Sequence, residues 1–364
     1  MRALRLYAGP LALQHLRDHG LRPDHVGVIP AAAGGPKGLI LGPIDRLLFG
    51  HWLRDAPQTI HLIGASIGAW RMGTACLRDP VAALQRLEHD YIHQHFELPP
   101  GQRRLTAQQV SEAFSANLQA FYGGRVDEVL QHPRWRLHIV TSRGLRLLAR
   151  DGRWRTPLGY MGAFAANALH RRALGGWMER VVFSAPDAPL GGVSALPFGT
   201  QDLRTRQIPL GPGNFMPAMQ ASCSIPFVLR PVADIPGAPQ GTYWDGGITD
   251  YHLHLRYHAR PEAPIVLYPH FQKAVVPGWL DKAWKRRHRS SDALDHMLVL
   301  APDPAWVRTL PNGKLPDRTD FQRYGQDLGA RVAVWQAAVK AAQQLADELD
   351  EWLARPDPSR VEAL

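Results

Sequence analysis

The first 80 residues of the sequence twice run from a short apolar segment with β-strand character, through small residues, into a segment with helical character. Residues 26–29 are the first strand candidate, and the stretch AAAGGPKG follows them. A helix candidate then spans 39–53. Within it, Pro43 either breaks the helix or lies in its first turn. Residues 59–63 are the second strand candidate, and a helix is expected at 66–77. This alternation predicts an α/β layer with a largely parallel sheet.

The rest of the chain continues the same pattern. Residues 186–213 are rich in proline and glycine and are expected to be irregular, and residues 235–241 are expected to form a loop. Apolar residues recur every three or four positions in 321–352, which predicts a long helix. We expect it to pack on the domain, and a helix that binds a membrane or a partner is the alternative. No linker is long enough to force a domain boundary. Further strands are expected at 137–141, 181–184, 242–245 and 265–268, and further helices at 81–96, 106–122, 158–174 and 214–222.

The composition is that of a soluble globular protein, because 45% of the 364 residues are hydrophobic and 20% are charged. The two cysteines, Cys76 and Cys223, cannot form a disulfide framework and lack metal-ligand spacing, so a reducing compartment is expected. The sequence shows neither a signal peptide nor a continuous apolar run long enough for a transmembrane helix. We therefore expect a cytoplasmic protein, one that can also associate peripherally with membranes.

The net charge of +10 favours anionic partners. No nucleic-acid-binding motif accompanies this charge, so no nucleic acid partner is expected. A cluster of basic residues in the second half of the chain is a candidate contact with an anionic membrane, although a solvated basic face would have the same composition. The candidate contact residues are Lys282, Lys285, Arg286, Arg287 and Arg289.

Ser66 lies at the turn between a strand candidate and a helix candidate, with Gly64 and Gly68 two residues away on either side. A nucleophile on such a sharp turn adopts a strained backbone conformation, and glycines at both flanking positions allow strand and helix to approach each other. The new helix also directs its positive end toward the serine. This context favours a nucleophile elbow, although a small polar residue that only packs in a glycine-rich turn would give the same pattern.

An acyl-transfer nucleophile needs backbone N–H groups to stabilise the developing oxyanion. The loop from Gly34 to Gly38 also follows a strand and opens a helix. Pro36 has no N–H, so the donors must come from Gly34, Gly35 or Lys37. The spacing matches neither a Walker A loop nor a dinucleotide-binding fingerprint.

Two kinds of base for Ser66 are compatible with the sequence. An α/β-hydrolase would use a histidine such as His252, His254 or His270, but with 17 histidines in the chain such a candidate can always be found. The alternative is Asp245, which ends a strand candidate and is followed by Gly246 and Gly247. Partial burial would raise the pKa of this carboxylate toward that of a useful base.

Taken in order, the motifs AGGPKG, GASIG and DGG resemble those of the patatin-like phospholipases, also called lipid acyl hydrolases. The segment ASCSIPF, which precedes Asp245, is similar to the Ala-Ser-x-Ala-x-Pro segment of that family. The resemblance extends from about Val26 to Gly247. It implies a three-layer α/β/α sandwich with a mostly parallel sheet. Separately, we expect residues 1–320 to form the acyl hydrolase domain and residues 321–364 to form a C-terminal helix packed on it.

The resemblance also implies roles for individual residues. Ser66 would be the nucleophile and Asp245 its base, with no histidine, metal or organic cofactor required. The oxyanion hole would be formed by the N–H groups of Gly34, Gly35 and Ile67. Lys37 stands where many members have arginine, and it would orient the loop or meet an anionic head group. The implied substrates are lipid esters, such as phospholipids or lysophospholipids. The supporting motif residues are Lys37, Gly38, Gly64, Gly68, Gly246 and Gly247.

The sequence departs from the family pattern in three places. Ala33 replaces the first glycine of a Gly-Gly-Gly run, Pro36 stiffens the loop, and residues 248–250 replace an Asn-x-Pro segment. These departures affect the expected substrate class and catalytic efficiency more than the assignment of Ser66 and Asp245 as the catalytic dyad. Two other functions stay open at this stage. One is an esterase with a Ser-His-Asp triad, and the other is a lipid-binding or scaffold protein without catalytic activity.

Overall fold

The computed structural model describes residues 1–96, 101–102, 105–187 and 191–364. Within this part the strands form one mixed, mostly parallel sheet, with the strand order β11-β1-β10-β9-β2-β3-β4-β5-β6. Strand β8 pairs with β4, and β7 pairs with β8. The strands are β1 (Leu4–Ala8), β2 (Val26–Ala31), β3 (Ile60–Ala65), β4 (Trp135–Gly144), β5 (Met178–Ser184), β6 (Thr205–Pro209), β7 (Val232–Ala233), β8 (Thr242–Asp245), β9 (Ile265–Pro269), β10 (Met297–Pro302) and β11 (Val361–Ala363).

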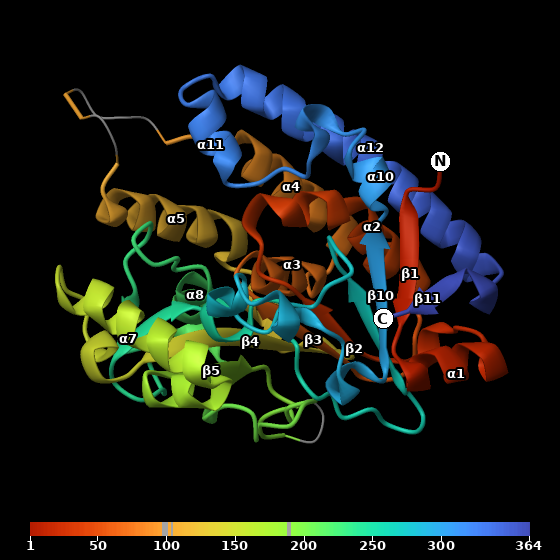
Figure 1. Cartoon of the computed structure of the whole chain (residues 1–364), viewed down its shortest axis with the longest axis horizontal. Coiled ribbons are helices and arrows are strands. Elements are labelled where there is room, and N and C mark those ends of the chain that lie inside the picture. Colours follow the sequence, from red (N-terminus) through yellow and green to blue (C-terminus); the bar gives the residue numbers. More distant parts are fainter. Residues whose placement is uncertain (97–100, 103–104, 188–190) are drawn as a thin grey trace.

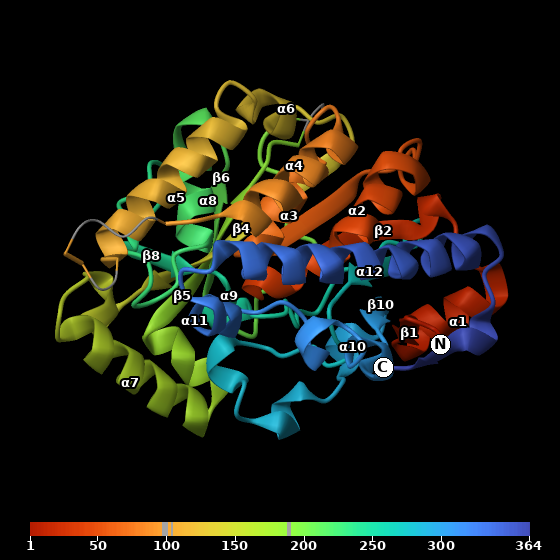
Figure 2. The same ribbon diagram turned by 90° about the horizontal axis from the view of Figure 1, so that it is seen from above.

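Helices flank the sheet, as Figures 1 and 2 show: α3, α4 and α5 lie on one side of it and α7 on the other. The three-layer α/β/α architecture with a mostly parallel sheet is therefore confirmed. The helices are α1 (Pro10–His19), α2 (Gly42–Leu47), α3 (Ile67–Ala75), α4 (Pro80–His93), α5 (Ala107–Tyr122), α6 (Val126–Leu130), α7 (Arg155–Leu169), α8 (Pro212–Ser222), α9 (Gly247–Asp250), α10 (Pro304–Val307), α11 (Thr319–Tyr324) and α12 (Leu328–Ala354).

The centre of the sheet consists of parallel strands that are covered on both faces. Strand β2 pairs in parallel with β3 on one side and with β9 on the other. All six residues of β2 are buried, which explains why this strand reads as a continuous apolar run rather than an alternating one. Because β2 and β3 run in the same direction, the loops that follow them emerge at the same edge of the sheet.

Strand β4 brings the ends of two distant strands together. Its Val140 pairs with Ala65, the last residue of the parallel strand β3. The next residue, Thr141, pairs with Asp245, the last residue of the antiparallel strand β8. Strands β3 and β8 therefore approach each other end to end along β4, and the residues that follow or end them meet at one point.

The C-terminal segment differs from the predicted single helix over 321–352. It forms two helices, because Gly325 has a left-handed φ of 52° that ends α11 and Asp327 caps the start of α12. Helix α12 runs beside α2 and α4 (Figure 1) and buries Trp335 and Trp352 completely. No helix among the described residues is both long and apolar enough to cross a membrane.

Several other boundaries also differ from the sequence prediction. The stretch 186–213, expected to be irregular, contains strand β6, and α7 begins at Arg155 and ends at Leu169 rather than spanning 158–174. The helix expected over 39–53 is divided into a 3₁₀ segment at Gly35–Leu41, helix α2 and a π-helical turn, with Pro43 in the first turn of α2. Helix α4 ends at His93, short of the predicted residue 96.

Candidate active site

Ser66 forms a strained turn between β3 and α3. Its backbone has φ 57° and ψ −129°, a region that non-glycine residues rarely occupy outside functional sites. A Cβ atom on Gly68 would lie 1.9 Å from the carbonyl oxygen of Ala31, and one on Gly64 would lie 2.3 Å from the Cα of Ala69. The two flanking positions therefore have no room for a side chain, and this close approach of strand and helix holds Ser66 in its turn.

Asp245 is a buried carboxylate at the end of β8. The N–H of Gly247 donates to its Oδ1 at 2.7 Å. The backbone around it is fixed by the end of α8 and the residues that follow, because the N–H of Asp245 donates to the Ser224 carbonyl at 3.0 Å and that of Gly246 to the Ser222 carbonyl at 3.2 Å. The carboxylate thus has a defined orientation and keeps its second oxygen for another donor.

Ser222 connects the two candidate catalytic segments. Its hydroxyl accepts the N–H of Ser66 at 2.9 Å and donates to the carbonyl of Val140 at 2.7 Å. Its own carbonyl accepts from Gly246. The ASCSIPF segment therefore serves a structural purpose, which is to hold the serine turn and the aspartate strand in a fixed relation.

The Ser66 hydroxyl is close enough to Asp245 and Cys223 to influence the pKa of both side chains. Burial raises the pKa of the Asp245 carboxyl, while the Arg318 charge, the Ser66 hydroxyl and the Gly247 N–H oppose this rise. Burial also raises the pKa of the Cys223 thiol, again with the Ser66 hydroxyl in opposition.

The glycine loop after β2 packs against the segment that follows Asp245. The N–H of Ala33 donates to the Tyr251 carbonyl at 2.9 Å, and a Cβ on Gly247 would lie 2.6 Å from the Cβ of Ala33. Gly35 has a left-handed φ of 57°, and a Cβ on Gly34 would lie 2.7 Å from the ring of Phe271. Glycine at positions 34 and 35 therefore allows the loop to approach the site in this conformation.

Several backbone N–H groups face this region without a partner. In the described part of the chain, the N–H groups of Gly34, Gly35 and Ile67 donate no hydrogen bond to the protein. Gly35 and Ile67 are the first residues of helical segments, where free N–H groups are expected. A Cβ on Gly38 would lie 3.5 Å from the Ile67 side chain. These N–H groups are candidate donors for a developing negative charge.

Two cavities of different character meet at Ser66 and Asp245. The first, of about 220 Å³, contains Asp245, Gly34 and several charged residues. The second, of about 440 Å³, contains Ser66 and Gly35 and is otherwise mainly apolar, lined among others by Trp70, Phe96, Val110, Phe114, Leu229 and Phe321. Ile225 and Arg318 line both cavities. The serine and the aspartate thus lie at the junction of a polar and an apolar compartment.

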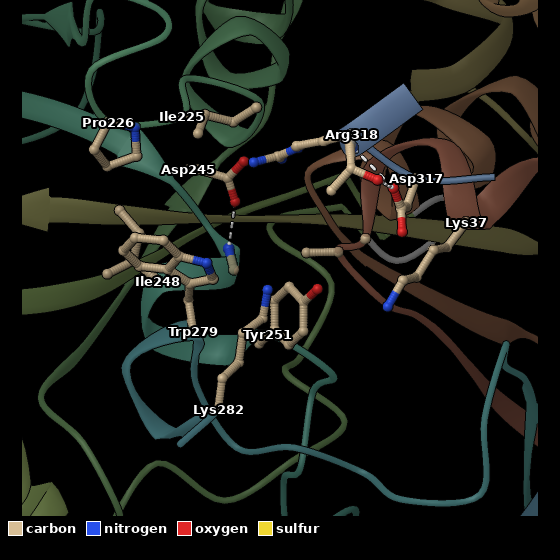
Figure 3. Close-up of a pocket in the computed structure, with 14 residues that line it drawn as sticks. Lys37, Ile225, Pro226, Asp245, Ile248, Tyr251, Trp279, Lys282, Asp317 and Arg318 are labelled. Atoms are coloured by element: carbon tan, nitrogen blue, oxygen red, sulfur yellow. Dashed lines mark hydrogen bonds between the residues drawn. The ribbon is translucent and has the colours of Figure 1, made fainter. Parts of the chain in front are cut away.

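The first cavity is cationic. Lys37, Lys282 and Arg318 line it from three different parts of the chain (Figure 3), and none of them forms an ion pair among the described residues. Removal from water, together with the charges of Lys37 and Arg318, lowers the pKa of Lys282 to about 8. Asp317 also lines this cavity, but its carboxylate is paired with Lys314 at 2.8 Å. The cavity therefore has an uncompensated positive charge that suits an anionic group.

The sequence had not indicated Arg318 or Trp279 as site residues, and it assigned Lys282 to a surface patch rather than to a cavity. Figure 3 shows the guanidinium of Arg318 directed at Asp245.

The alternative histidine bases lie elsewhere. His252, His254 and His270 are engaged with backbone carbonyls of residues 272–275, and no histidine lines either cavity in the described part of the chain.

The influence of Arg318 on Asp245 leads to a pH prediction. If Asp245 acts as a base, activity is present above the pKa of its carboxyl and is lost as the pH falls through that pKa. Arg318 lowers this pKa, so Arg318→Gln should raise it and shift the acidic limb of the kcat/KM profile to higher pH. Arg323→Gln, an exposed residue of α11, the helix that begins just after Arg318, is the matched control. An unchanged acidic limb in Arg318→Gln would contradict a role for Asp245 as the base.

Comparisons with known proteins were made for the whole chain. No protein-family model matches it, and no curated protein is significantly similar to it. Among solved structures, VipD from Legionella pneumophila aligns at 14% sequence identity with a TM-score of 0.37, over 90% of this chain and 67% of that one. A TM-score of this size supports no functional assignment, so the function is inferred below from the motifs and the geometry of the site.

Proposed function

We propose that this protein is a serine acyl hydrolase that cleaves carboxylic ester bonds of lipids with a Ser66–Asp245 dyad. The observation that supports this most directly is the meeting of β3 and β8 along β4, which places a strained serine and a buried aspartate side by side at the junction of two cavities. The motif resemblance to patatin-like phospholipases points to the same chemistry. The free N–H groups of the glycine loop complete the arrangement.

The reaction would proceed through an acyl-enzyme. Asp245 accepts the proton of the Ser66 hydroxyl as its oxygen attacks the ester carbonyl carbon, and the N–H groups of Gly34, Gly35 and Ile67 stabilise the resulting oxyanion. The alcohol leaves with the proton that Asp245 returns, and Ser66 remains acylated. A water molecule then gives a proton to Asp245 and attacks the acyl carbonyl, which releases the fatty acid and regenerates Ser66.

The two cavities support a lipid substrate with an anionic head group. An acyl chain would fill the apolar cavity beside Ser66, whose volume lies within the range of about 300–1,000 Å³ typical of ligand sites. The head group would lie in the cationic cavity against Lys37, Lys282 and Arg318. The scissile carbonyl would then fall at the junction. Phospholipids and lysophospholipids have this distribution of apolar and anionic parts.

Of the two possible bases, the geometry favours aspartate. A triad enzyme needs a histidine within hydrogen-bond reach of the nucleophile. The described residues around Ser66 and Asp245 include no histidine, and the three histidine candidates contact another loop. The position of Asp245 also fits a base, because burial raises its pKa toward the operating pH.

Covalent labelling tests this function. A fluorophosphonate probe should label the wild-type protein at Ser66, because only an activated serine attacks phosphorus at a useful rate. Ser66→Ala should not be labelled, and Asp245→Asn should be labelled far more slowly. Peptide mapping by mass spectrometry identifies the modified residue. Unlabelled wild-type protein would leave the non-catalytic lipid-binding alternative as the better description.

A further inference from the structure

Exposed apolar side chains are concentrated on one part of the molecule. Apart from Met1 and Leu11, every large hydrophobic residue that is exposed among the described residues belongs to α7, to residues 147–154 just before it, to Phe227–Val228, or to Trp279. Single exposed apolar residues are normal on a protein surface, but such a concentration marks an interaction site. The location of this cluster therefore indicates a function that the hydrolytic site alone does not explain.

Helix α7 is apolar on both of its faces. Its inner face packs Tyr160 and Ala163 into a core cluster with Trp244. The opposite face presents Leu158, Met161 and Phe164 to solvent, with Met161 63% exposed. Arg155 is the helix's one charged residue. A surface helix of a globular protein normally has polar residues on its outer face, so α7 lacks a partner that would cover this face.

The surroundings of α7 are strongly basic. Residues 146–172, which contain α7 and its flanks, include six arginines and a single acidic residue, Asp151. Arg150, Arg153, Arg155 and Arg172 form no ion pair among the described residues. Asp151 accepts from the Thr156 hydroxyl at 2.7 Å, near the start of the helix. An apolar helix face with basic flanks is the pattern of helices that lie in the interface of an anionic bilayer.

Helix α7 packs beside residues that line the rims of both cavities. The ring of Tyr160 contacts that of Phe227 at 5.7 Å, and the neighbouring residues Pro226 and Val228 line the two cavities. At the other end, Phe164 stacks on Trp284 at 6.5 Å. The short segment before Trp284 contributes Trp279 and Lys282 to the cationic cavity. Material that covered α7 would therefore also lie beside the entrance to the candidate active site.

We propose that α7, with Trp154 before it and Phe227, Val228 and Trp279 beside it, is a membrane-docking surface that inserts into the interface of an anionic lipid bilayer. The flanking arginines contact the lipid head groups, together with Lys285 and Arg286, which are exposed beside Trp284. Arg287 is excluded from this surface, because it binds Asp281 at 2.7 Å and the carbonyls of Asn167 and Ala168. Trp154, 72% exposed, suits the interfacial region of a bilayer.

A second copy of the chain is a less suitable partner. An isologous dimer through α7 would bring the arginine flanks of both copies into one interface, where like charges repel. A bilayer that contains anionic lipids provides the opposite charge together with an apolar interior. Charge complementarity therefore favours the membrane.

Vesicle co-sedimentation of the full chain tests the proposal, with vesicles of phosphatidylcholine alone and of phosphatidylcholine mixed with phosphatidylglycerol. We expect binding to the mixed vesicles, weaker binding to phosphatidylcholine alone, and a blue shift of tryptophan emission on binding. The double variant Leu158→Glu/Met161→Glu should lower the partition coefficient by at least about tenfold, because each carboxylate must enter the apolar layer. Gln336→Glu/Ala337→Glu on the exposed side of α12 adds the same charge and should bind like the wild type.

This test is independent of hydrolysis, since Ser66→Ala protein should bind vesicles as the wild type does. Arg153→Gln/Arg155→Gln should reduce the preference for mixed vesicles over neutral ones. Absence of binding to both kinds of vesicle, or equal binding by the Leu158→Glu/Met161→Glu variant, would overturn the proposal. A concentration-dependent dimer that this variant abolishes would also overturn it and would identify a second copy as the partner of α7.

Discussion

Replacement of Ser66 by alanine or of Asp245 by asparagine is expected to reduce kcat/KM for p-nitrophenyl acyl esters by about 10⁴-fold or more. Both changes preserve the local structure. Alanine occupies the positive-φ turn with the same Cβ as serine, and an asparagine oxygen can still accept the Gly247 N–H. The loss of activity would therefore report the missing nucleophile or base. Release of p-nitrophenol measured spectrophotometrically gives the rates.

Matched substitutions separate this loss from a loss of folding. Ser184→Ala removes another buried serine, one that contacts His138 and Gln207 away from both cavities, and Asp292→Asn removes an exposed carboxylate. Both should retain most of the activity. His252→Gln, His254→Gln and His270→Gln address the rival triad. If one of these three variants were as inactive as Ser66→Ala, the dyad assignment would be wrong and a Ser-His-Asp triad would replace it.

The sequence predicted those parts of the site that depend on local chain geometry. The strand and the helix around Ser66 were predicted because glycines at 64 and 68 next to an apolar run have few structural interpretations, and the structure has β3 and α3 at these places. The strand that ends at Asp245 was predicted for a similar reason. The catalytic roles of both residues are still predictions. Their proximity depends on β4, and no local pattern identifies the shared partner strand.

The sequence did not identify residues whose role depends on long-range packing. Arg318 lies in a polar segment between two short helices, and nothing in its neighbours distinguishes it from the other arginines. It reaches Asp245 only because α11 folds back over the site. Strands β1 and β10 were missed as well. Strand β1 occupies an outer position, and its pairing with β10 joins residues almost 300 positions apart.

A different buried network lies next to the candidate site and joins β5 to α9. Arg180 of β5 is fully buried and binds both oxygens of Asp250, at 2.7 and 2.6 Å. It also contacts Asp202, whose side chain is 39% exposed. Asp250 is the last residue of α9, the short helix that begins at Gly247 just after Asp245. The ion pair thus anchors the backbone that presents the candidate base.

Arg180→Met is expected to reduce the free energy of unfolding by about 3–5 kcal/mol, because among the described residues it leaves the buried carboxylate of Asp250 with Arg171, at 3.8 Å, as its one cationic neighbour. The double variant Arg180→Met/Asp250→Leu should recover much of this stability, since replacing both partners leaves no unpaired buried charge. Urea denaturation followed by circular dichroism measures both values. Arg22→Met, which breaks an exposed ion pair with Asp24, is the control and should leave the midpoint unchanged. If Arg180→Met were as stable as this control, or if the double variant were no more stable than the single one, the network would not be what holds α9 and Asp245 in place.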